Sequence, residues 1–330
     1  MKTSAVAGLV RLTVAITVKD DRARLEALLA SLASGDRVPD ELVVVDAGST
    51  DGSREAAEAW SKSVPFPVRV VVEPGSRGRG RQRCVEVARG DVVCFIDSDC
   101  EAPPDWLERY ARAWSEARAH GEHTGALGGA NRTPSRSTPF QHAVDDVMGE
   151  MEARSFHGIN TINCTYGREA LLEAGGFRDM QTAEDPDLNA RIARRGYVLR
   201  RIDNPVAHER RRTWRALLRQ HFAYGEGAAE LLRRYPEYFP ALERWIAPTG
   251  AACAAVLLAF AVLVHWAWAV ALLGLLGLVP LVVHRAFVAR FWRTHGASQA
   301  FARRIGVLWA VYAPYELGLL VARLRGGRPA

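Results

Sequence analysis

Two aspartates separated by one residue follow an apolar run of strand length. Asp97 and Asp99 come directly after residues 92–96, and Ser98 lies between them. In an extended segment, residues i and i+2 point the same way, so both carboxylates can face one ion. Two carboxylates favour a hard divalent cation such as Mg²⁺ or Mn²⁺, which would bind diphosphate oxygens. Alternatively, the three residues are an acidic turn before a helix capped by Asp105.

The elements that position these aspartates follow from hydrophobic periodicity. Apolar runs alternate with segments of helical spacing, which predicts strands at 12–18, 42–45, 68–72 and 92–96 and helices at 22–33, 51–63 and 79–89. This order implies right-handed crossovers and a parallel sheet with helices on both faces, so the fold class is α/β. The pattern also predicts a strand at 125–130 and helices at 140–153, 168–174 and 186–195.

Acidic residues gather at one edge of the predicted sheet. Ligands of such sheets bind outside the carboxyl ends of the strands. Those ends carry Asp20 and Asp21 after the first strand, Asp46 after the second, and Asp97 and Asp99 after the fourth. Carboxylates so close together destabilise one another unless a cation or a hydrogen-bonding ligand lies among them. We therefore expect a ligand site at this edge.

Three blocks of the sequence resemble the family-two inverting glycosyltransferases, which have the Rossmann-like GT-A fold. The blocks are residues 41–53 (ELVVVDAGSTDGS), residues 90–99 (GDVVCFIDSD), and residues 175–177 (GGF) followed by 184–188 (EDPDL). They occur in the family's order across residues 12–225. The resemblance implies a GT-A domain at residues 1–225 that binds a nucleotide sugar and transfers the sugar from its diphosphate.

The resemblance also implies a donor-binding set. Asp46 would hold the base or ribose of the nucleotide, although Ala47 stands where relatives usually have a second acid, so base recognition would be thinner. Arg81 falls where the family commonly has an arginine and would contact the nucleotide or its phosphates; the alternative is a solvated helix arginine. The full expected set is Thr17, Asp21, Asp46, Arg81, Asp97, Ser98, Arg219 and Gln220.

An inverting transfer needs a carboxylate that takes the acceptor's proton as its oxygen attacks the anomeric carbon. Asp185 occupies the family's position for this base, and Glu184 would contact the acceptor or orient Asp185. Because Pro186 suits the first turn of a helix, Glu184 or Asp185 is expected at its N-cap, and a cap without chemistry is the alternative. His208 lies where GT-A enzymes often have a late histidine and would complete a metal site with Asp97 and Asp99, unless it is structural or exposed.

A basic segment at residues 215–224 (RALLRQHFAY) resembles the Arg/Gln-rich segment that covers the donor in processive and lipid-directed relatives. Arg219 and Gln220 could clamp the diphosphate, since arginine offers several donors in one plane. The alternative is a basic helix on phospholipid headgroups, and the two roles are compatible. The QxxRW motif of those relatives is absent, which argues against a processive polymerase.

Residues 249–283 contain no Asp, Glu, Lys or Arg. As one helix this run would be about 52 Å long at ~1.5 Å per residue, whereas a hydrocarbon core is ~30 Å thick. We therefore expect a transmembrane hairpin at residues 248–283, turning near Trp266 and Trp268. Arginines at both ends predict that both ends and the catalytic domain lie on the cytoplasmic side of the inner membrane. The alternative is a buried hairpin in a soluble protein.

Basic segments flank this run. Residues 226–247 are expected to be a juxtamembrane segment, 284–304 an amphipathic connector, and 305–330 a third membrane or interfacial helix with a tail, interrupted at Pro314. Basic residues beside an apolar block fit anionic lipid or diphosphate better than nucleic acid. Because no zinc-finger or RNA-recognition pattern accompanies them, we expect anionic lipid and no nucleic acid among the partners.

The five cysteines form no CxxC pair and suit reduced thiols in a cytosolic domain. The beginning of the sequence lacks a signal-peptide pattern, because Lys19, Asp20 and Asp21 interrupt its apolar stretch. The expected function is metal-assisted sugar transfer to a lipid-linked acceptor, in polyprenyl-linked glycan, exopolysaccharide or glycolipid synthesis. Two alternatives remain: a nucleotidyltransferase, which would need a glycine-rich phosphate-binding signature, and a membrane scaffold with a degenerate transferase domain.

Overall fold

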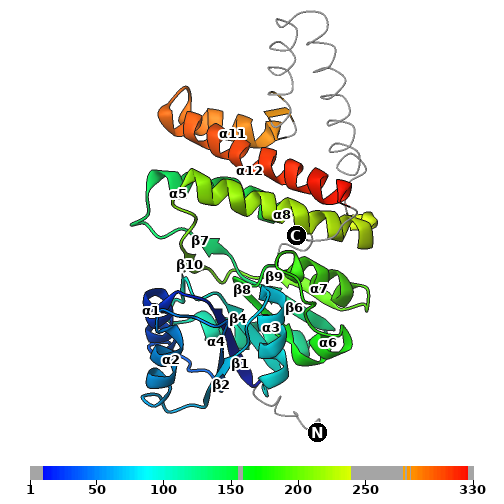
Figure 1. Ribbon diagram of the computed structural model, residues 1–330. Coiled ribbons are helices and arrows are strands. Elements are labelled where there is room, and N and C mark those ends of the chain that lie inside the picture. The colour runs from blue at the N-terminus through cyan, green and yellow to red at the C-terminus, as the bar shows by residue number, and fades with distance from the viewer. Residues whose placement is uncertain (1–9, 155–158, 239–277, 279–280, 283, 326–330) are drawn as a thin grey trace, which may run out of the picture. The chain divides into compact units, whose positions relative to one another are not determined.

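The computed structural model describes residues 10–154, 159–238, 278, 281–282 and 284–325 (Figure 1). The chain divides into two compact units. The first contains Met1–Ser137 and Glu152–Glu209, and the second contains Thr138–Met151 and Arg210–Ala330. The hairpin predicted at residues 248–283 falls almost wholly outside the described residues and stays a prediction.

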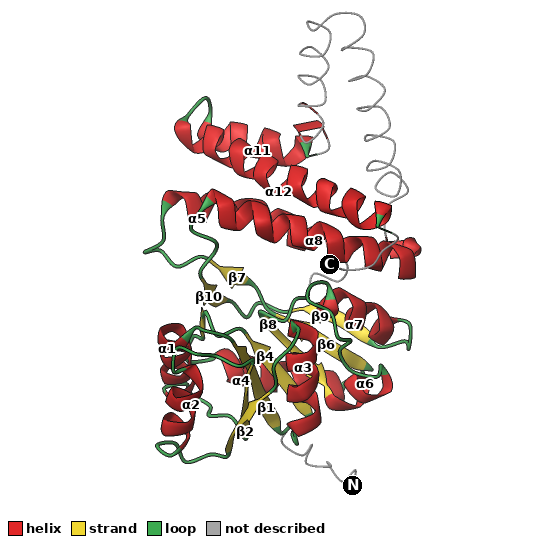
Figure 2. Cartoon of the chain, viewed as in Figure 1, coloured by secondary structure: helices red, strands yellow, loops and turns green. Residues whose placement is uncertain are grey.

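The first unit is built on a seven-stranded sheet (Figure 2). In spatial order its strands are β3 (Val68–Val72), β2 (Glu41–Asp46), β1 (Leu12–Val18), β4 (Val92–Ile96), β8 (Asn163–Gly167), β6 (Thr124–Gly128) and β9 (Val198–Arg201). Strands β1 to β4 are parallel, as predicted. Strand β8 is antiparallel to both β4 and β6, so the sheet is mixed. The α/β prediction is confirmed, and the uninterrupted parallel arrangement ends at β4.

Helices cover both faces of this sheet (Figure 1). On one face lie α1 (Arg22–Ala33), α2 (Ser53–Ser61) and α4 (Trp106–Ala119). On the other face lie α3 (Arg77–Val87), α6 (Arg168–Glu173) and α7 (Glu184–Ala193). Along β1, Val14 and Ile16 belong to the first core and Ala15 to the second. Because successive strand side chains point to opposite faces, these apolar strands can fill both cores.

Strand β8 was not predicted, and it is fixed in the sheet by a buried polar side chain, Asn163. Its Oδ1 accepts hydrogen bonds from Trp106 Nε1 (2.9 Å) and Tyr110 Oη (3.0 Å). Its Nδ2 donates to the carbonyl oxygens of Ala130 (2.9 Å) and Asn204 (2.7 Å). One side chain therefore joins β8 to α4 and to the segments that lead into the second sheet of this unit.

That second sheet consists of β5 (Cys100–Glu101), β10 (Val206–His208) and β7 (Asn131–Arg132). Strand β10 runs antiparallel to β5, with His208 opposite Cys100. Since Cys100 directly follows Asp99, this pairing places His208 beside the segment that contains the two aspartates.

The second unit is helical in its described residues: α5 (Pro139–Arg154), α8 (Trp214–Arg234), the 3-10 helix η2 (Pro236–Tyr238), α11 (Arg285–His295) and α12 (Gln299–Leu324). The predicted elements at 125–130, 140–153, 168–174 and 186–195 thus correspond to β6, α5, α6 and α7. Helices α8 and α12 meet at two glycines: a Cβ on Gly225 would overlap the carbonyl oxygen of Tyr315, and one on Gly318 that of Phe222. Helix α8 continues past residue 225, which the sequence predicted to be the end of the GT-A domain.

Helix α12 is the one helix in the described part of the chain that is long and apolar enough to cross a membrane. Its most apolar stretch has a mean hydropathy of 1.6, and 39% of that stretch is buried within the protein. The helix begins at Gln299, earlier than the predicted residue 305, because Ser298 caps it by accepting a bond from Phe301 N (3.3 Å). Pro314 does not interrupt it; packing against α8 offsets the one backbone hydrogen bond that proline removes.

The buried hydrogen bonds of Asn163 generate a test of the fold. Asn163→Ala would leave the indole N–H of Trp106 and the carbonyl of Asn204 without their partner, at about 1–3 kcal/mol for each buried group. We expect the free energy of unfolding to fall by at least about 2 kcal/mol, measured by urea unfolding with tryptophan fluorescence. Asp203→Ala is the control, since its side chain is 84% exposed. Equal stability of the two variants would contradict the role given to Asn163.

Candidate active site

Asp46 ends β2 and is held by the turn that follows. Its Oδ2 accepts hydrogen bonds from the backbone N–H groups of Gly48 and Ser49, both at 3.0 Å. The turn has φ +80° at Gly48, a conformation that favours glycine. The side chain is buried, and its Oδ1 has no hydrogen-bond donor among the described residues. A buried carboxylate oxygen without a donor is costly, so Oδ1 suits an N–H or O–H group of a ligand.

The Asp97–Asp99 segment leaves β4 with its side chains in different surroundings. The backbone N–H of Asp97 donates to the carbonyl of Ile162 (3.2 Å), and its carboxylate is partly exposed. Ser98 is turned toward the start of α1, where its hydroxyl donates to Oδ2 of Asp21 (3.1 Å). The structure thus brings Asp21 and Ser98 together with the aspartate pair.

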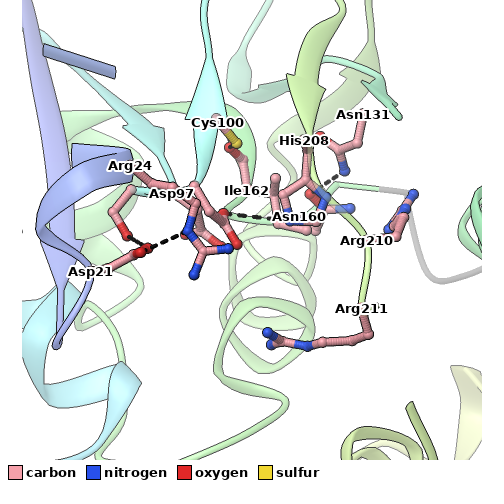
Figure 3. A network of polar contacts seen from close by, with 12 residues as sticks. Asp21, Arg24, Asp97, Cys100, Asn131, Asn160, Ile162, His208, Arg210 and Arg211 are labelled. Atoms are coloured by element: carbon pink, nitrogen blue, oxygen red, sulfur yellow. Dashed lines mark hydrogen bonds and ion pairs between the residues drawn. The ribbon is translucent and has the colours of Figure 1, made fainter. Parts of the chain in front are cut away.

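His208 lies beside Asp99, with 3.5 Å between Nε2 and Asp99 Oδ1. Figure 3 shows His208 and Asn160 on one side of Asp97, and Asp21 on the other. Among the residues that the structure describes, no three His, Cys, Asp or Glu side chains form a group that could hold a metal ion. Asp97, the remaining predicted ligand, is paired with an arginine instead.

That arginine is Arg81 of α3, and it is buried between two carboxylates. Its Nη2 lies 3.2 Å from Asp97 Oδ1, and its Nη1 forms an ion pair with Glu184. Only 5% of Arg81 is exposed, so the alternative of a solvated helix arginine is wrong. The reason is helix geometry: α3 turns Arg81 toward the acidic edge of the sheet, whereas Arg83 faces solvent. Arg81 therefore joins the β4 end to the start of α7.

The predicted base, Asp185, lies in the first turn of α7. Its Oδ2 accepts a hydrogen bond from the backbone N–H of Thr161 (3.3 Å). Desolvation raises the pKa of Asp185, while the charge of Arg81 and the Thr161 N–H act in the opposite direction. The capping prediction is wrong, because α7 already begins at Glu184 and Ala183 occupies the cap position with φ +67°.

Three predicted donor residues are placed less directly. Thr17 is half-buried in β1, where its methyl group faces Gly80 of α3. Arg219 and Gln220 belong to α8 in the second unit, where Arg219 is exposed and Gln220 donates to the hydroxyl of Tyr224 (2.8 Å). Their part in donor binding remains a prediction.

Sequence reasoning missed three residues near these side chains. Arg24 of α1 donates through Nε to Asp21 Oδ1 (2.7 Å), and Asn131 Nδ2 donates to Asn160 Oδ1 (3.2 Å) (Figure 3). The i, i+3 spacing of Asp21 and Arg24 in a first helical turn was a usable signal. The asparagines gave none, because their contact joins the first residue of β7 to the loop before β8, 29 residues further along the chain.

The sequence matches two family models: Glycosyl transferase family 2 at residues 13–167, and Glycosyl transferase family group 2 at residues 92–293. Among curated proteins, succinoglycan biosynthesis protein ExoA of Rhizobium meliloti is 26% identical over 85% of this chain and 93% of its own length. Probable glycosyltransferase YdaM of Bacillus subtilis is 24% identical over 68% of this chain, which spans only 55% of the YdaM length.

The fold is shared with the mannosyltransferase PcManGT from Pyrobaculum calidifontis, whose structure contains GDP-Man and Mn²⁺. That comparison has a TM-score of 0.64 and 20% identity, and it covers 97% of this chain and 88% of the other. One family model alone accounts for more than half of the 330 residues. The protein is therefore a glycosyltransferase of the GT-A fold and belongs to glycosyl transferase family 2.

Proposed function

We propose that this protein transfers one sugar, with inversion, from a nucleotide-diphosphate donor to a lipid-linked acceptor, with Asp185 as the general base. The observation that carries the proposal is the pairing of Arg81 with both Asp97 and Glu184. One guanidinium joins the carboxylate expected at the diphosphate to the residue next to the expected base. In this proposal, a residue of the donor site and a residue next to the base therefore contact the same side chain.

On the donor side, Asp46 would bind the base or ribose through Oδ1, in a site that Thr17, Asp21 and Ser98 help to form. Asp97, Asp99 and His208 would hold Mg²⁺ or Mn²⁺, since two carboxylates and an imidazole suit such ions. The ion would supply charge that stabilises the departing nucleotide diphosphate. The 3.5 Å pair of Asp99 and His208 supports this assignment. Arg81, which is paired with Asp97 here, would contact a phosphate oxygen of the donor.

On the acceptor side, Asp185 takes the proton of the attacking hydroxyl. The new bond forms at the anomeric carbon, and the bond from that carbon to the diphosphate oxygen breaks. Glu184 is 4% exposed and paired with Arg81. This burial supports the role of orienting Asp185 over direct contact with the acceptor. Arg219 and Gln220 of the second unit would clamp the diphosphate or lie on lipid headgroups.

The membrane part of the proposal rests on the second unit. Helix α12 has the length and hydropathy of a membrane helix, and the apolar run at residues 249–283 would add a hairpin. The arginines of α8, among them Arg215, Arg219, Arg233 and Arg234, would contact anionic lipid on the cytoplasmic side. ExoA is a succinoglycan biosynthesis protein, which supports an acceptor of the exopolysaccharide kind.

The function is tested with a panel of nucleotide sugars, a polyprenyl-phosphate acceptor and Mn²⁺ or Mg²⁺. We expect one donor to give nucleotide release, and Asp185→Asn to lower kcat by about 100-fold or more, since a general base contributes roughly 10²–10⁴. Binding of UDP or GDP should stay within about twofold, because Asp185 does not contact the nucleotide in this scheme. Asp203→Asn is the control, because its side chain is 84% exposed. Full activity of Asp185→Asn would rule out the assigned base.

The pH dependence follows from the surroundings of Asp185. Its pKa is raised by desolvation, and a base acts only when ionised, so activity should be lost as pH falls through this raised pKa. We expect the acidic limb of kcat/KM above the usual range of an aspartate. Arg81→Gln should move that limb to still higher pH, because the arginine charge favours the ionised carboxylate. An acidic limb at the ordinary aspartate value would contradict the assignment.

If the assigned residues bind the metal ion, removing one of them should weaken metal-dependent nucleotide binding. We expect Asp99→Asn and His208→Ala each to weaken Mn²⁺-dependent binding of UDP or GDP about tenfold or more, as losses of this size follow removal of a metal contact. Isothermal titration with and without EDTA measures the effect. Asp91→Asn, at the opposite end of β4, is the control because its side chain is 46% exposed. Unchanged Mn²⁺ dependence in both variants would remove these residues from the metal site.

A further inference from the structure

The guanidinium of Arg24 is paired through one of its nitrogen atoms and leaves its other two available. Its Nε donates to Asp21 Oδ1 (2.7 Å). In the described part of the chain, neither Nη1 nor Nη2 of Arg24 forms a hydrogen bond. About half of the side chain, 49%, is exposed. Since a guanidinium has five N–H donors, the four on the two Nη atoms are left for a solute.

Asp21, the residue that binds Arg24, also contacts the Asp97–Asp99 segment. Asp21 lies at the N-cap position of α1 but makes no side-chain capping bond, although aspartate is a favoured cap. Its two oxygens are used differently: Oδ1 binds Arg24, and Oδ2 accepts the hydroxyl of Ser98 (3.1 Å). Asp21 therefore orients the guanidinium relative to the residue between the two aspartates.

The charges around Arg24 place it at the same end of the sheet. Its guanidinium interacts electrostatically with Asp21, Asp99 and Glu209. Figure 3 shows Arg24 extending from α1 to Asp21, next to Asp97. Asp99 also lies 3.5 Å from Nε2 of His208. A cation held between acidic groups keeps its charge, so the N–H groups of Arg24 that are not paired can bind an anion.

We propose that Arg24 binds a phosphoryl group of a substrate through its two Nη atoms. Planar guanidinium groups bind two phosphate oxygens at once, and a charge-assisted bond of this kind is among the strongest that side chains form. The proposal rests on the proposed function, because a sugar transferase of this kind handles phosphate in its donor diphosphate and in a polyprenyl-phosphate acceptor. Both sources offer the same chemistry to Arg24.

Direct binding separates the two sources. Isothermal titration of the full-length chain in detergent is carried out with UDP or GDP, in Mn²⁺ and in EDTA, and separately with a polyprenyl phosphate. We expect Arg24→Ala to weaken one class of probe about tenfold or more, as fits loss of a charge-assisted contact. If the variant binds UDP or GDP more weakly than the wild type in EDTA as well as in Mn²⁺, Arg24 binds the donor. If it binds the polyprenyl phosphate more weakly than the wild type, Arg24 binds the acceptor. Arg24→Lys should recover only part of the affinity, because lysine lacks the planar fork.

Arg22→Ala is the matched control. Arg22 lies in the same helical turn with a similarly exposed side chain, but its Nε is paired with Glu26 (2.9 Å) and not with Asp21, the carboxylate that accepts the Ser98 hydroxyl. Thermal unfolding verifies that each variant is folded. If the alanine variant of Arg24 does not fold, Arg24→Gln is used in its place. Wild-type affinity of a folded Arg24 variant for all probes would overturn this inference alone. A wild-type chain that binds none of the probes would overturn the proposed function together with it.

Discussion

The pairing of Arg81 with Asp97 and Glu184 is the interaction on which the site depends. Without a buried cation, the carboxylates at this edge would repel one another and lose hydration without compensation. Arg81 is 5% exposed and binds both partners from α3. It therefore holds the two carboxylates in place. The same charge lowers the pKa of Asp185 against the effect of desolvation, so one side chain influences Asp97, Glu184 and Asp185.

The position of Arg81 depends in turn on how α3 packs against the loop before α7. Gly78 has no room for a side chain, because a Cβ there would overlap the carbonyl oxygen of Arg178. The Gly78 N–H donates to the Met180 carbonyl (2.9 Å), and the Phe177 N–H donates to Gln82 Oε1 (2.8 Å). These contacts bring the first turn of α3 against the segment that leads to Glu184. The ion pairs of Arg81 are thus a consequence of close backbone packing.

The opposite ends of the strands are fixed by a different buried network. Glu41 accepts hydrogen bonds from Thr13 Oγ1 (2.9 Å) and Arg89 N (2.8 Å), and it pairs with Arg69 (2.5 Å). This network sets the relative register of β1, β2 and the turn before β4. With the register fixed, Asp46 and Asp97 emerge at the same edge of the sheet. Polar networks of this kind stabilise one arrangement because every buried group is satisfied.

The sequence by itself determined the local parts of this protein: strands β1 to β4, the helices between them, and the acidic residues at their carboxyl ends. Those features depend on periodicity and on residues that are close in the chain. The tertiary structure alone decided the rest. Strand β8 is five residues long with only Cys164 and Tyr166 in the apolar core, and it is held by the side-chain bonds of Asn163. The ion pairs of Arg81, the contact of His208 with Asp99 and the hydrogen bond from Ser98 to Asp21 all join segments that are distant in sequence. No local pattern encodes these contacts, because their energy is gained only when the chain has folded and water is excluded.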